Sequence, residues 1–390
     1  MMNHVVRALA IIQLAAALGC GAEPAASSPL EIRLASPLDF QVAQRGTRAE
    51  GTILVAGAIL PESKGELPVD RLEARLVGKD LSGQWQALAF DPRVSAFRAA
   101  LAAPAGGWYR LEVRALRRAA VVAAAVVEHV GVGEVFVVAG QSNSANYGEE
   151  RQTNQTGLVS AFDGAAWSPA GDPEPGAGGK GGSFLPPMGD LLATRFHVPI
   201  GLVALGIGST SVREWLPSGV RLTNLPPLTR NVVTVGPGQW ESSGAIFRNF
   251  TARLRSLGPH GFRAVLWHQG ESDAHQAEAD RTLPGELYRQ CLERLIGETH
   301  REIGWEAPWF VAQASYHGPN DLASPDIRAA QKALWDAGIA LPGPDSDTLT
   351  GSMRASHGTG VHLSGAGLRA HGRLWADKIS PWLERQLDGH

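Results

Sequence analysis

Nucleophilic catalysis needs a nucleophile, a base that removes its proton and a group that orients the base, and this chain contains candidates for each. The candidate nucleophile is Ser142, in the turn Gly140-Gln-Ser-Asn143 that follows an apolar run. There its hydroxyl would lie at the end of a buried strand. Its backbone N–H would lie at a helix N-terminus, where it can stabilise an oxyanion. A plain N-cap serine is the alternative interpretation of this turn.

Two further segments bring polar groups to comparable positions. Leu266-Trp-His-Gln-Gly-Glu-Ser-Asp273 continues another apolar run and concentrates polar side chains at its end. His362 precedes a C-terminal helical pattern that begins after Ser364. A histidine there is placed to take the proton from Ser142, although a histidine of a surface loop would give the same pattern.

From about residue 132 onward, strand-like and helical patterns alternate. The short apolar runs typical of strands are residues 134–139, 199–205, 262–267 and 308–312. Such alternation predicts a parallel sheet with helices on both faces. The ligand site of such a sheet lies at the carboxyl ends of its strands, which is where the polar segments fall.

The helices are indicated by apolar residues three or four positions apart. The two clearest faces are Ile246, Phe247, Phe250, Leu254 and Leu257, and then Leu287, Cys291, Leu292, Leu295 and Ile296. Ser324 and Pro325 supply the N-cap and first position of a third helix. Cys291 is therefore expected to be a buried core thiol. The Gly- and Pro-rich residues 164–187 predict a long loop, and such loops are usually mobile or functional.

The region before residue 130 has a different pattern. Strand candidates separated by turn signals are residues 31–34, 50–60, 72–77, 85–90 and 108–116. Short strands at regular intervals, without helical periodicity, favour a small β-sandwich. The apolar run 119–127 has only nine residues, so it predicts a buried strand and not a membrane helix.

The first 26 residues have the pattern of an export signal. A short segment with one positive charge precedes residues 8–18, which contain a single polar side chain. Ala17-Leu-Gly-Cys20 resembles a bacterial lipoprotein processing site, in which a lipid on Cys20 would attach the protein to a membrane. Ordinary cleavage near residues 22–26 is the alternative. Either interpretation predicts export, to the bacterial periplasm, to the outer membrane as a lipoprotein, or out of the cell.

Composition narrows the class of protein. The 390 residues have a formal net charge of −3, so no basic field is present to hold nucleic acid or an anionic membrane. Two cysteines exclude a disulfide framework and a four-thiolate zinc site. The 46 glycines and 25 prolines indicate many turns and loops. We expect a signal (1–26), a β-sandwich (27–131) and an α/β domain (132–390).

The polar segments together resemble the SGNH-type hydrolases, specifically the sialate O-acetylesterase and acetylxylan esterase group. That group has Gly-Gln-Ser-Asn, Gly-Gly-Thr-x-Ile-x-x-Trp, His-Gln-Gly-Glu and Asp-x-x-His in this order. The corresponding segments here are Gly140-Gln-Ser-Asn143, Gly208-Ser-Thr-Ser-Val-Arg-Glu-Trp215, His268-Gln-Gly-Glu271 and Thr359-Gly-Val-His362. The resemblance covers roughly residues 132–385 and implies a flavodoxin-like SGNH domain. A preceding β-sandwich is also similar to the multidomain sialate esterases.

The resemblance implies a role for each matching residue. Ser142 would be the nucleophile, and His362 the general base that later returns a proton to the leaving sugar hydroxyl. The oxyanion hole would combine the Ser142 N–H, a backbone N–H at Gly208-Ser209 and a Gln269 side-chain N–H. Ser209 stands where the family has a second glycine, which a backbone donor tolerates if the turn does not need positive φ.

The resemblance implies the residues that brace the nucleophile turn, and the acid that orients His362, less directly. Gln141 and Asn143 would brace the nucleophile turn. The aspartate expected three residues before His362 is Thr359, which cannot be an anion. Glu271 is the first substitute, because some relatives are described with that glutamate as the acid; Asp273 is the second, and a Ser–His pair without an acid is the third. On this interpretation Glu271→Ala lowers turnover steeply and Asp273→Ala does not.

Several other residues have both a functional and a structural interpretation. His268 and His275 lie near Glu271 without a third ligand at metal-like spacing, so no metal is expected. Tryptophans beside the motifs could stack on a sugar or lie in the core: Trp215, Trp240 and Trp267. Arginines that could meet a substrate carboxylate or lie on the surface are Arg213, Arg248 and Arg354.

The resemblance therefore implies a carbohydrate O-acetylesterase that needs no cofactor and acts on an acetylated carbohydrate such as sialic acid or xylan. Two alternatives remain. The first is a glycan-binding relative without activity, which the substitution at Thr359 makes conceivable. The second is an SGNH lipase or thioesterase with another acyl preference.

Overall fold

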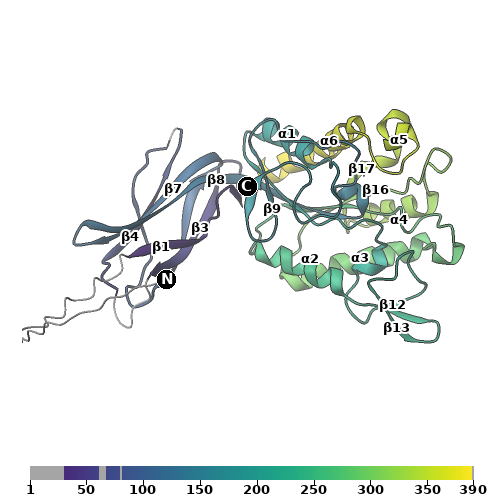
Figure 1. Ribbon diagram of the computed structural model, residues 1–390, viewed down its shortest axis with the longest axis horizontal. Helices are drawn as coiled ribbons and strands as arrows, with labels where there is room; N and C mark the ends of the chain where they lie inside the picture. The colour runs from purple at the N-terminus through teal and green to yellow at the C-terminus, as the bar shows by residue number, and fades with distance from the viewer. Residues whose placement is uncertain (1–29, 61–66, 80, 389–390) are drawn as a thin grey trace, which may run out of the picture.

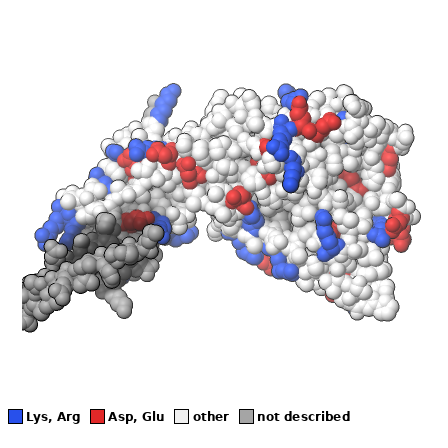
Figure 2. All heavy atoms as spheres, in the orientation of Figure 1, with Lys and Arg blue, Asp and Glu red and all other residues white. Residues whose placement is uncertain are grey.

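The computed structural model describes residues 30–60, 67–79 and 81–388. The predicted export signal, with Cys20, lies outside these residues. The chain forms an elongated β-rich lobe at its N-terminal side and a larger lobe of strands and helices (Figure 1). In the described part of the chain, no helix is both long and apolar enough to cross a membrane. Positive and negative side chains are interspersed on the face shown in Figure 2, as the small net charge suggests.

The N-terminal lobe has two layers of strands. One is the antiparallel sheet β1-β3-β6, with β1 Glu31–Ser36, β3 Glu50–Leu60 and β6 Ala96–Pro104. The other contains β2 Gln41–Gln44, β4 Arg71–Val77, β5 Gln86–Leu88, β7 Gly106–Arg117 and the first part of β8. Residues of both layers, among them Ile53, Leu72 and Leu111, share one buried cluster. All five strand predictions are confirmed, whereas β2 and β6 were not predicted. The separate β-sandwich domain stays a prediction.

The two lobes share strand β8, Ala120–Gly140, which has 21 residues. Its first part pairs antiparallel with β7, and its last residues pair parallel with strands of the second lobe. The two separately predicted strands at 119–127 and 134–139 are therefore one. The expectation that 119–127 is buried is wrong, because Val121 and Val126 are 54% and 43% exposed. Only alternate residues of this half face the cluster, and the others face solvent.

The second lobe is built on a sheet in the order β10-β9-β11-β8-β15-β16-β17. The strands are β9 Val159–Phe162, β10 Trp167–Pro169, β11 Ile200–Ala204, β15 Ala264–His268, β16 Trp309–Gln313 and β17 Leu341–Asp345. Without the edge strands β9 and β10, the parallel strands follow the flavodoxin-like order 2-1-3-4-5. The order reverses between β8 and β15, and a ligand site is expected at that switch point.

Helices cover both faces of this sheet (Figure 1). Helices α1 Leu185–Phe196 and α6 Gly365–Asp388 share one core cluster with the sheet, and α2 Ala245–Ser256, α3 Gly285–Ile303 and α4 Pro325–Asp336 share the other. These elements confirm the predicted helical faces. The predicted caps are also present, since Ser324 Oγ accepts from the Ile327 N–H and Ser364 Oγ from the Gly367 N–H. Cys291, on α3, is half-buried against the core cluster and not fully buried as predicted; burial raises its pKa to about 12.

A small three-stranded sheet, which was not predicted from the sequence, projects beside the helices (Figure 1). It consists of β12 Arg221–Leu222, β13 Val232–Gly236 and β14 Gln239–Ser242, in the order β12-β14-β13. These strands were missed because they are short and mostly exposed, so they have little of the apolar signal used to find strands.

Candidate active site

The ends of β8 and β15 are brought together at the switch point. Gly140 pairs with His268, and the Gln141 N–H donates to the His268 carbonyl at 3.0 Å. Gly140 has φ +127°, and a Cβ built on it would lie 2.0 Å from that same carbonyl oxygen. Only glycine therefore permits this approach. Ser142, two positions after Gly140, is the first residue of the short 3-10 helix Ser142–Ser144 and is 5% exposed.

Backbone donors without acceptors occur in the turn that contains Ser142 and in the turn that contains Gly208. Within the described part of the chain, the backbone N–H groups of Ser142, Gly208 and Ser209 donate to no protein atom. The turn that contains Gly208 is held against the nucleophile, since the Ile207 N–H donates to the Gly140 carbonyl at 2.9 Å. Unsatisfied backbone donors at one place are what an oxyanion site requires.

The turn from Gly208 to Trp215 departs from expectation at Ser209. Its φ is +60°, so this turn does need a positive φ, and the serine does not replace the family's glycine without cost. A non-glycine residue in this conformation costs about 1–2 kcal/mol. Interactions elsewhere in the turn hold it: Ser211 and Glu214 form a capping box, and Trp215 Nε1 donates to Thr210 Oγ1.

Glu271 lies on the other side of the nucleophile turn and is 5% exposed. Asn143 Nδ2 donates to Glu271 Oε1 at 2.9 Å and to the Val361 carbonyl at 3.3 Å. Arg354 Nη1 donates to the same carbonyl at 2.8 Å. These bonds bring the segment before His362 to the nucleophile turn, together with a carboxylate. Glu271 Oε2 is buried and has no partner among the described residues.

The environment of His362 favours its neutral form. Burial lowers the pKa of this imidazole below its usual value; the nearby Glu271 carboxylate opposes the shift and the Arg354 cation adds to it. Among the described residues, the His362 ring contacts the Tyr147 ring, and neither it nor the Ser142 hydroxyl makes a hydrogen bond. Catalytic hydrogen bonds are often loose without substrate, so this geometry does not exclude a Ser–His pair.

Asp273 points in a different direction from Glu271. Its carboxylate accepts from Ser211 Oγ, the Val212 N–H and Arg213 Nη2, and from Gln269 Nε2 at 2.6 Å. It is fully buried and forms an ion pair with Arg213 at 3.2 Å. The carboxylate therefore stabilises the Gly208–Trp215 turn, and its hydrogen bonds are made there.

The two predicted glutamines connect the motifs to one another. Gln141 Oε1 accepts from the Ser272 N–H at 2.9 Å and from Gln269 Nε2 at 3.2 Å. Gln269 Nε2 also lies 3.2 Å from the Thr210 carbonyl. Its N–H groups are therefore engaged with protein acceptors, Asp273 included, while its Oε1 is buried without a partner.

Tyr147, which was not predicted from the sequence, also lies beside His362. Its ring centroid lies 5.4 Å from that of His362, and the residue is 37% exposed. A Cβ built on Gly208 would lie 2.5 Å from the same ring. The segment between β10 and α1 passes beside it, with Gly178 hydrogen-bonded to Gly206 and Asn146. This segment is shorter than the predicted loop 164–187, because β10 and the first residues of α1 lie within that range. No motif marks Tyr147, because it contacts these residues only through the fold.

The remaining candidates have structural surroundings. Thr359 is exposed and donates to the Ser356 carbonyl within its own loop. Trp215, Trp267, Arg213 and Arg354 are buried, Trp240 is half-buried, and exposed Arg248 donates to the Ser243 carbonyl. His268 contacts Ser346, and His275 contacts Asp321. Among the described residues, no group of three or more metal-ligating side chains is placed to hold a metal.

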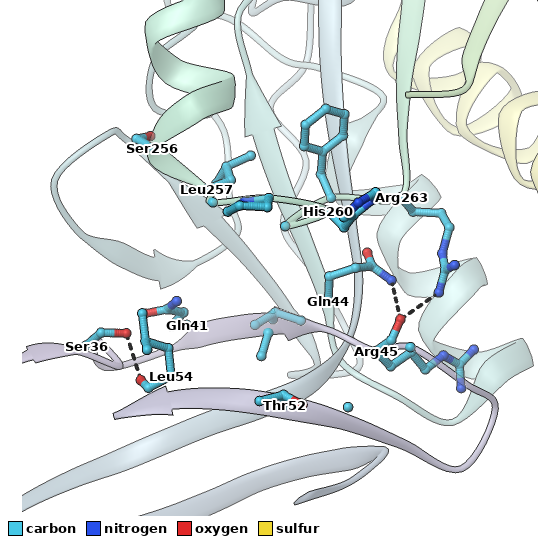
Figure 3. A pocket seen from close by; sticks show the side chains of 18 of the residues that line it. Ser36, Gln41, Gln44, Arg45, Thr52, Leu54, Ser256, Leu257, His260 and Arg263 are labelled. Atoms are coloured by element: carbon cyan, nitrogen blue, oxygen red, sulfur yellow. Dashed lines mark hydrogen bonds between the residues drawn. The ribbon is translucent and has the colours of Figure 1, made fainter. Parts of the chain in front are cut away.

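A large cavity of about 1190 Å³ lies elsewhere, between the N-terminal strands and the segment that leads into β15 (Figure 3). Gln44 and Arg263 meet there at the Arg45 carbonyl. Arg263 immediately precedes β15, so the cavity lies at the amino ends of the parallel strands. Ser142 follows the carboxyl end of β8, and the cavity is therefore not part of the active site.

The comparisons with known proteins identify the family of the chain. Residues 132–380 match the family described as carbohydrate esterase, sialic acid-specific acetylesterase. The chain therefore belongs to this family, and its class is that of a carbohydrate O-acetylesterase. No curated protein sequence gives a significant match.

Solved structures show the likeness in fold. A carbohydrate acetylesterase from Xanthomonas citri superposes with a TM-score of 0.50 at 18% identity, over 88% of this chain and 74% of that one. A protein from Arabidopsis thaliana superposes with a TM-score of 0.44 at 18% identity, over 64% of this chain and 98% of that one. At these identities the likeness concerns the fold alone.

Proposed function

We propose that the protein is a serine esterase that removes O-acetyl groups from a carbohydrate through an acyl-enzyme on Ser142. The observation that supports this most directly is the Asn143 bridge. It joins the nucleophile turn to Glu271 and to the carbonyl next to His362, and so brings all three proposed catalytic residues to one edge of the sheet.

The reaction has two halves. In the first, His362 takes the proton of Ser142 as the serine oxygen attacks the acetyl carbonyl; the tetrahedral oxyanion then collapses and His362 returns the proton to the leaving sugar oxygen. In the second, His362 takes a proton from water, which attacks the acetyl-serine. Collapse of the second tetrahedral intermediate releases acetate, and the proton returns to Ser142.

The proposed oxyanion hole consists of the Ser142 N–H and a backbone N–H at Gly208-Ser209, which have no acceptor in the described chain. The Gln269 donor implied by the family resemblance is engaged with Asp273 and Thr210. A direct role would require it to give up one of these bonds. We therefore assign Gln269 the role of bracing the hole, together with Gln141.

We propose Glu271 as the group that orients His362. Its Oε1 is held by Asn143, and its buried Oε2 has no partner among the described residues, which leaves it able to accept from the imidazole. Asp273 already accepts from four groups and faces the Gly208–Trp215 turn. The Glu271 carboxylate would provide the negative charge that Thr359 cannot carry.

The direct test uses a chromogenic acetyl ester with the wild-type protein and Ser142→Ala. We expect hydrolysis that disappears in the variant. Absence of hydrolysis by the wild type, with glycan binding retained, would support the second candidate, a non-catalytic glycan-binding relative; the missing Ser142–His362 hydrogen bond is the observation that favours it. A panel of acetylated xylan, sialic acid and pectin then identifies the sugar, and longer acyl esters separate an acetylesterase from a lipase or thioesterase.

Two features outside the site complete the proposal. We propose that residues 1–26 direct export, with a lipid on Cys20 as the membrane attachment, and that residues 27–131 form a β-sandwich preceding the esterase domain. Both rest on the sequence patterns described above.

A further inference from the structure

Two consecutive residues of the turn that leads into β13 contact the turn that contains Ser209. Arg230 Nη2 donates to the Gly208 carbonyl at 2.8 Å, and Asn231 Nδ2 donates to Glu214 Oε1 at 2.9 Å. Gly208 and Glu214 lie near opposite ends of this turn. The segment itself is fixed, because the Ser243 N–H donates to the Asn231 carbonyl at 2.9 Å. The segment between β12 and β13 therefore holds the Gly208–Trp215 turn.

The contact with Gly208 determines the direction of an N–H group. The peptide between Gly208 and Ser209 is trans, so its carbonyl and its N–H point in opposite directions. Because the carbonyl points to Arg230, the Ser209 N–H points away from it, where it meets no acceptor in the described chain. A cation on the carbonyl oxygen also polarises the amide and strengthens its N–H as a donor.

The backbone conformation shows why this peptide needs to be held. Ser209 has φ +60°, which is unfavourable for a residue with a Cβ. Rotation of the peptide plane by about 180° would bring that φ to roughly −120°, which lies in the broad allowed β region. Gly208 tolerates the accompanying change in ψ. The same rotation would turn the carbonyl inward and remove the N–H from the site.

We infer that Arg230 is a positioning residue that keeps the Gly208–Ser209 peptide in the orientation in which the Ser209 N–H can bind the oxyanion. This inference rests on the proposed function, since it assigns that N–H to the oxyanion hole. Arg230 is exposed and contacts the turn from outside, so it acts through the peptide and not on the reacting atoms.

The test compares the full-length wild type, Arg230→Met and Arg230→Lys on p-nitrophenyl acetate, an ester without a carboxylate that an arginine could bind. For Arg230→Met we expect kcat to fall about 10- to 100-fold with KM changed less than about twofold, because loss of an oriented donor affects the transition state. Arg230→Lys should retain more activity than Arg230→Met. The matched control is Arg248→Met, an exposed arginine that also donates to a backbone carbonyl, and it should be unaffected.

A second substitution separates positioning from a general structural role. Glycine adopts φ +60° without strain, so Ser209→Gly combined with Arg230→Met should recover part of the lost kcat. Unchanged kcat in Arg230→Met, while Ser142→Ala is inactive, would overturn the inference and leave the proposed function intact. A rise in KM confined to carboxylated sugar esters would overturn it as well, in favour of substrate binding by Arg230. If wild-type protein hydrolyses no ester, the proposed function itself fails.

Discussion

Asn143 donates its side-chain amide to Glu271 across 128 positions of the chain, at 2.9 Å. This bond joins the residue after the nucleophile to the carboxylate that we assign to His362. A second bond from the same amide reaches the Val361 carbonyl, one residue before that histidine. The amide of Asn143 therefore holds Glu271, and the segment before His362, relative to the turn that contains Ser142.

Replacement of this acid should affect catalysis more than stability. For Glu271→Gln we expect kcat to fall by about 10² to 10⁴, because a neutral amide cannot stabilise the imidazolium of His362. Steady-state kinetics and a thermal unfolding curve measure the two effects. Glu306→Gln, at an exposed position, is the control. Full activity in Glu271→Gln would show that the base works without this carboxylate.

The structure changes the expectation for Asp273. Sequence reasoning predicted that its loss does not lower turnover steeply, but the carboxylate holds the Gly208–Trp215 turn and pairs with buried Arg213. Breaking a buried ion pair on one side costs about 3–5 kcal/mol. Asp273→Asn should therefore lower the free energy of unfolding by about this amount, measured with denaturant, and should lower activity as well. Wild-type stability together with lost activity would instead indicate a catalytic acid.

The pH dependence of activity should reflect the lowered pKa of His362. Burial disfavours the imidazolium, so the base stays neutral below the ordinary histidine pKa of about 6.5. Activity should fall as pH decreases through this lowered value, and the acid limb of kcat/KM should have its midpoint below about 6.5.

The direction of the His362 pKa shift can be tested with a variant and with the pH dependence of the free energy of unfolding. The Glu271 carboxylate raises the His362 pKa, so Glu271→Gln should move the acid limb to still lower pH. The unfolded chain binds the proton more readily than the folded one, so this histidine contributes a loss of stability as pH falls from about 6.5 toward its folded pKa. A midpoint above 6.5 in the wild type would contradict the assignment of His362 as a half-buried base.

Ser209 offers a test of backbone strain. Glycine removes the penalty of φ +60° but adds entropy to the unfolded chain, so Ser209→Gly should stabilise the protein by up to about 1 kcal/mol. We expect kcat within twofold of wild type, because the N–H is retained. Ser209→Ala keeps the Cβ and the strain, and should show no gain. A loss of stability in the glycine variant would mean that the serine hydroxyl matters more than the backbone.

Tyr147 should influence recognition of the sugar more than the chemical step. It presents a partly exposed ring beside His362, and aromatic contacts are worth about 0.5–1.5 kcal/mol beyond their area. Tyr147→Ala should raise KM for an acetylated glycan about three- to tenfold, with a smaller effect on p-nitrophenyl acetate. Equal effects on both substrates would indicate that the ring only positions His362.

A related substitution tests the contact between Tyr147 and the oxyanion turn. A methyl group at Gly208 would lie 2.5 Å from the tyrosine ring, so Gly208→Ala must displace one of them. We expect Gly208→Ala to lower kcat, and Tyr147→Ala in the same chain to restore part of it because the clash is removed. The measurement is the ratio of kcat in the double variant to kcat in Gly208→Ala. A ratio of one would show that the added methyl group disturbs the turn itself and not its contact with the tyrosine.

Much of the architecture was predictable because its signals are local. Alternating apolar runs and helical faces indicated the strands and helices around the site, and the Ser324 cap defined the start of α4. The continuous strand β8 was not predictable, since its two halves have different burial patterns and only their pairing partners show that they are one element. The exposed strands β12–β14 lacked an apolar pattern.

By itself, the sequence determined which segments meet at the carboxyl edge of the sheet, because polar motifs that directly follow buried parallel strands must end there. The family resemblance ranked Glu271 before Asp273, but the residues alone do not show the surroundings of these two carboxylates, which are two residues apart in one motif. Only the tertiary structure separates them: Glu271 faces Asn143, and Asp273 faces the turn. Arg230 has no local signal either, since its contact with Gly208 spans 22 positions and exists only because the chain folds back.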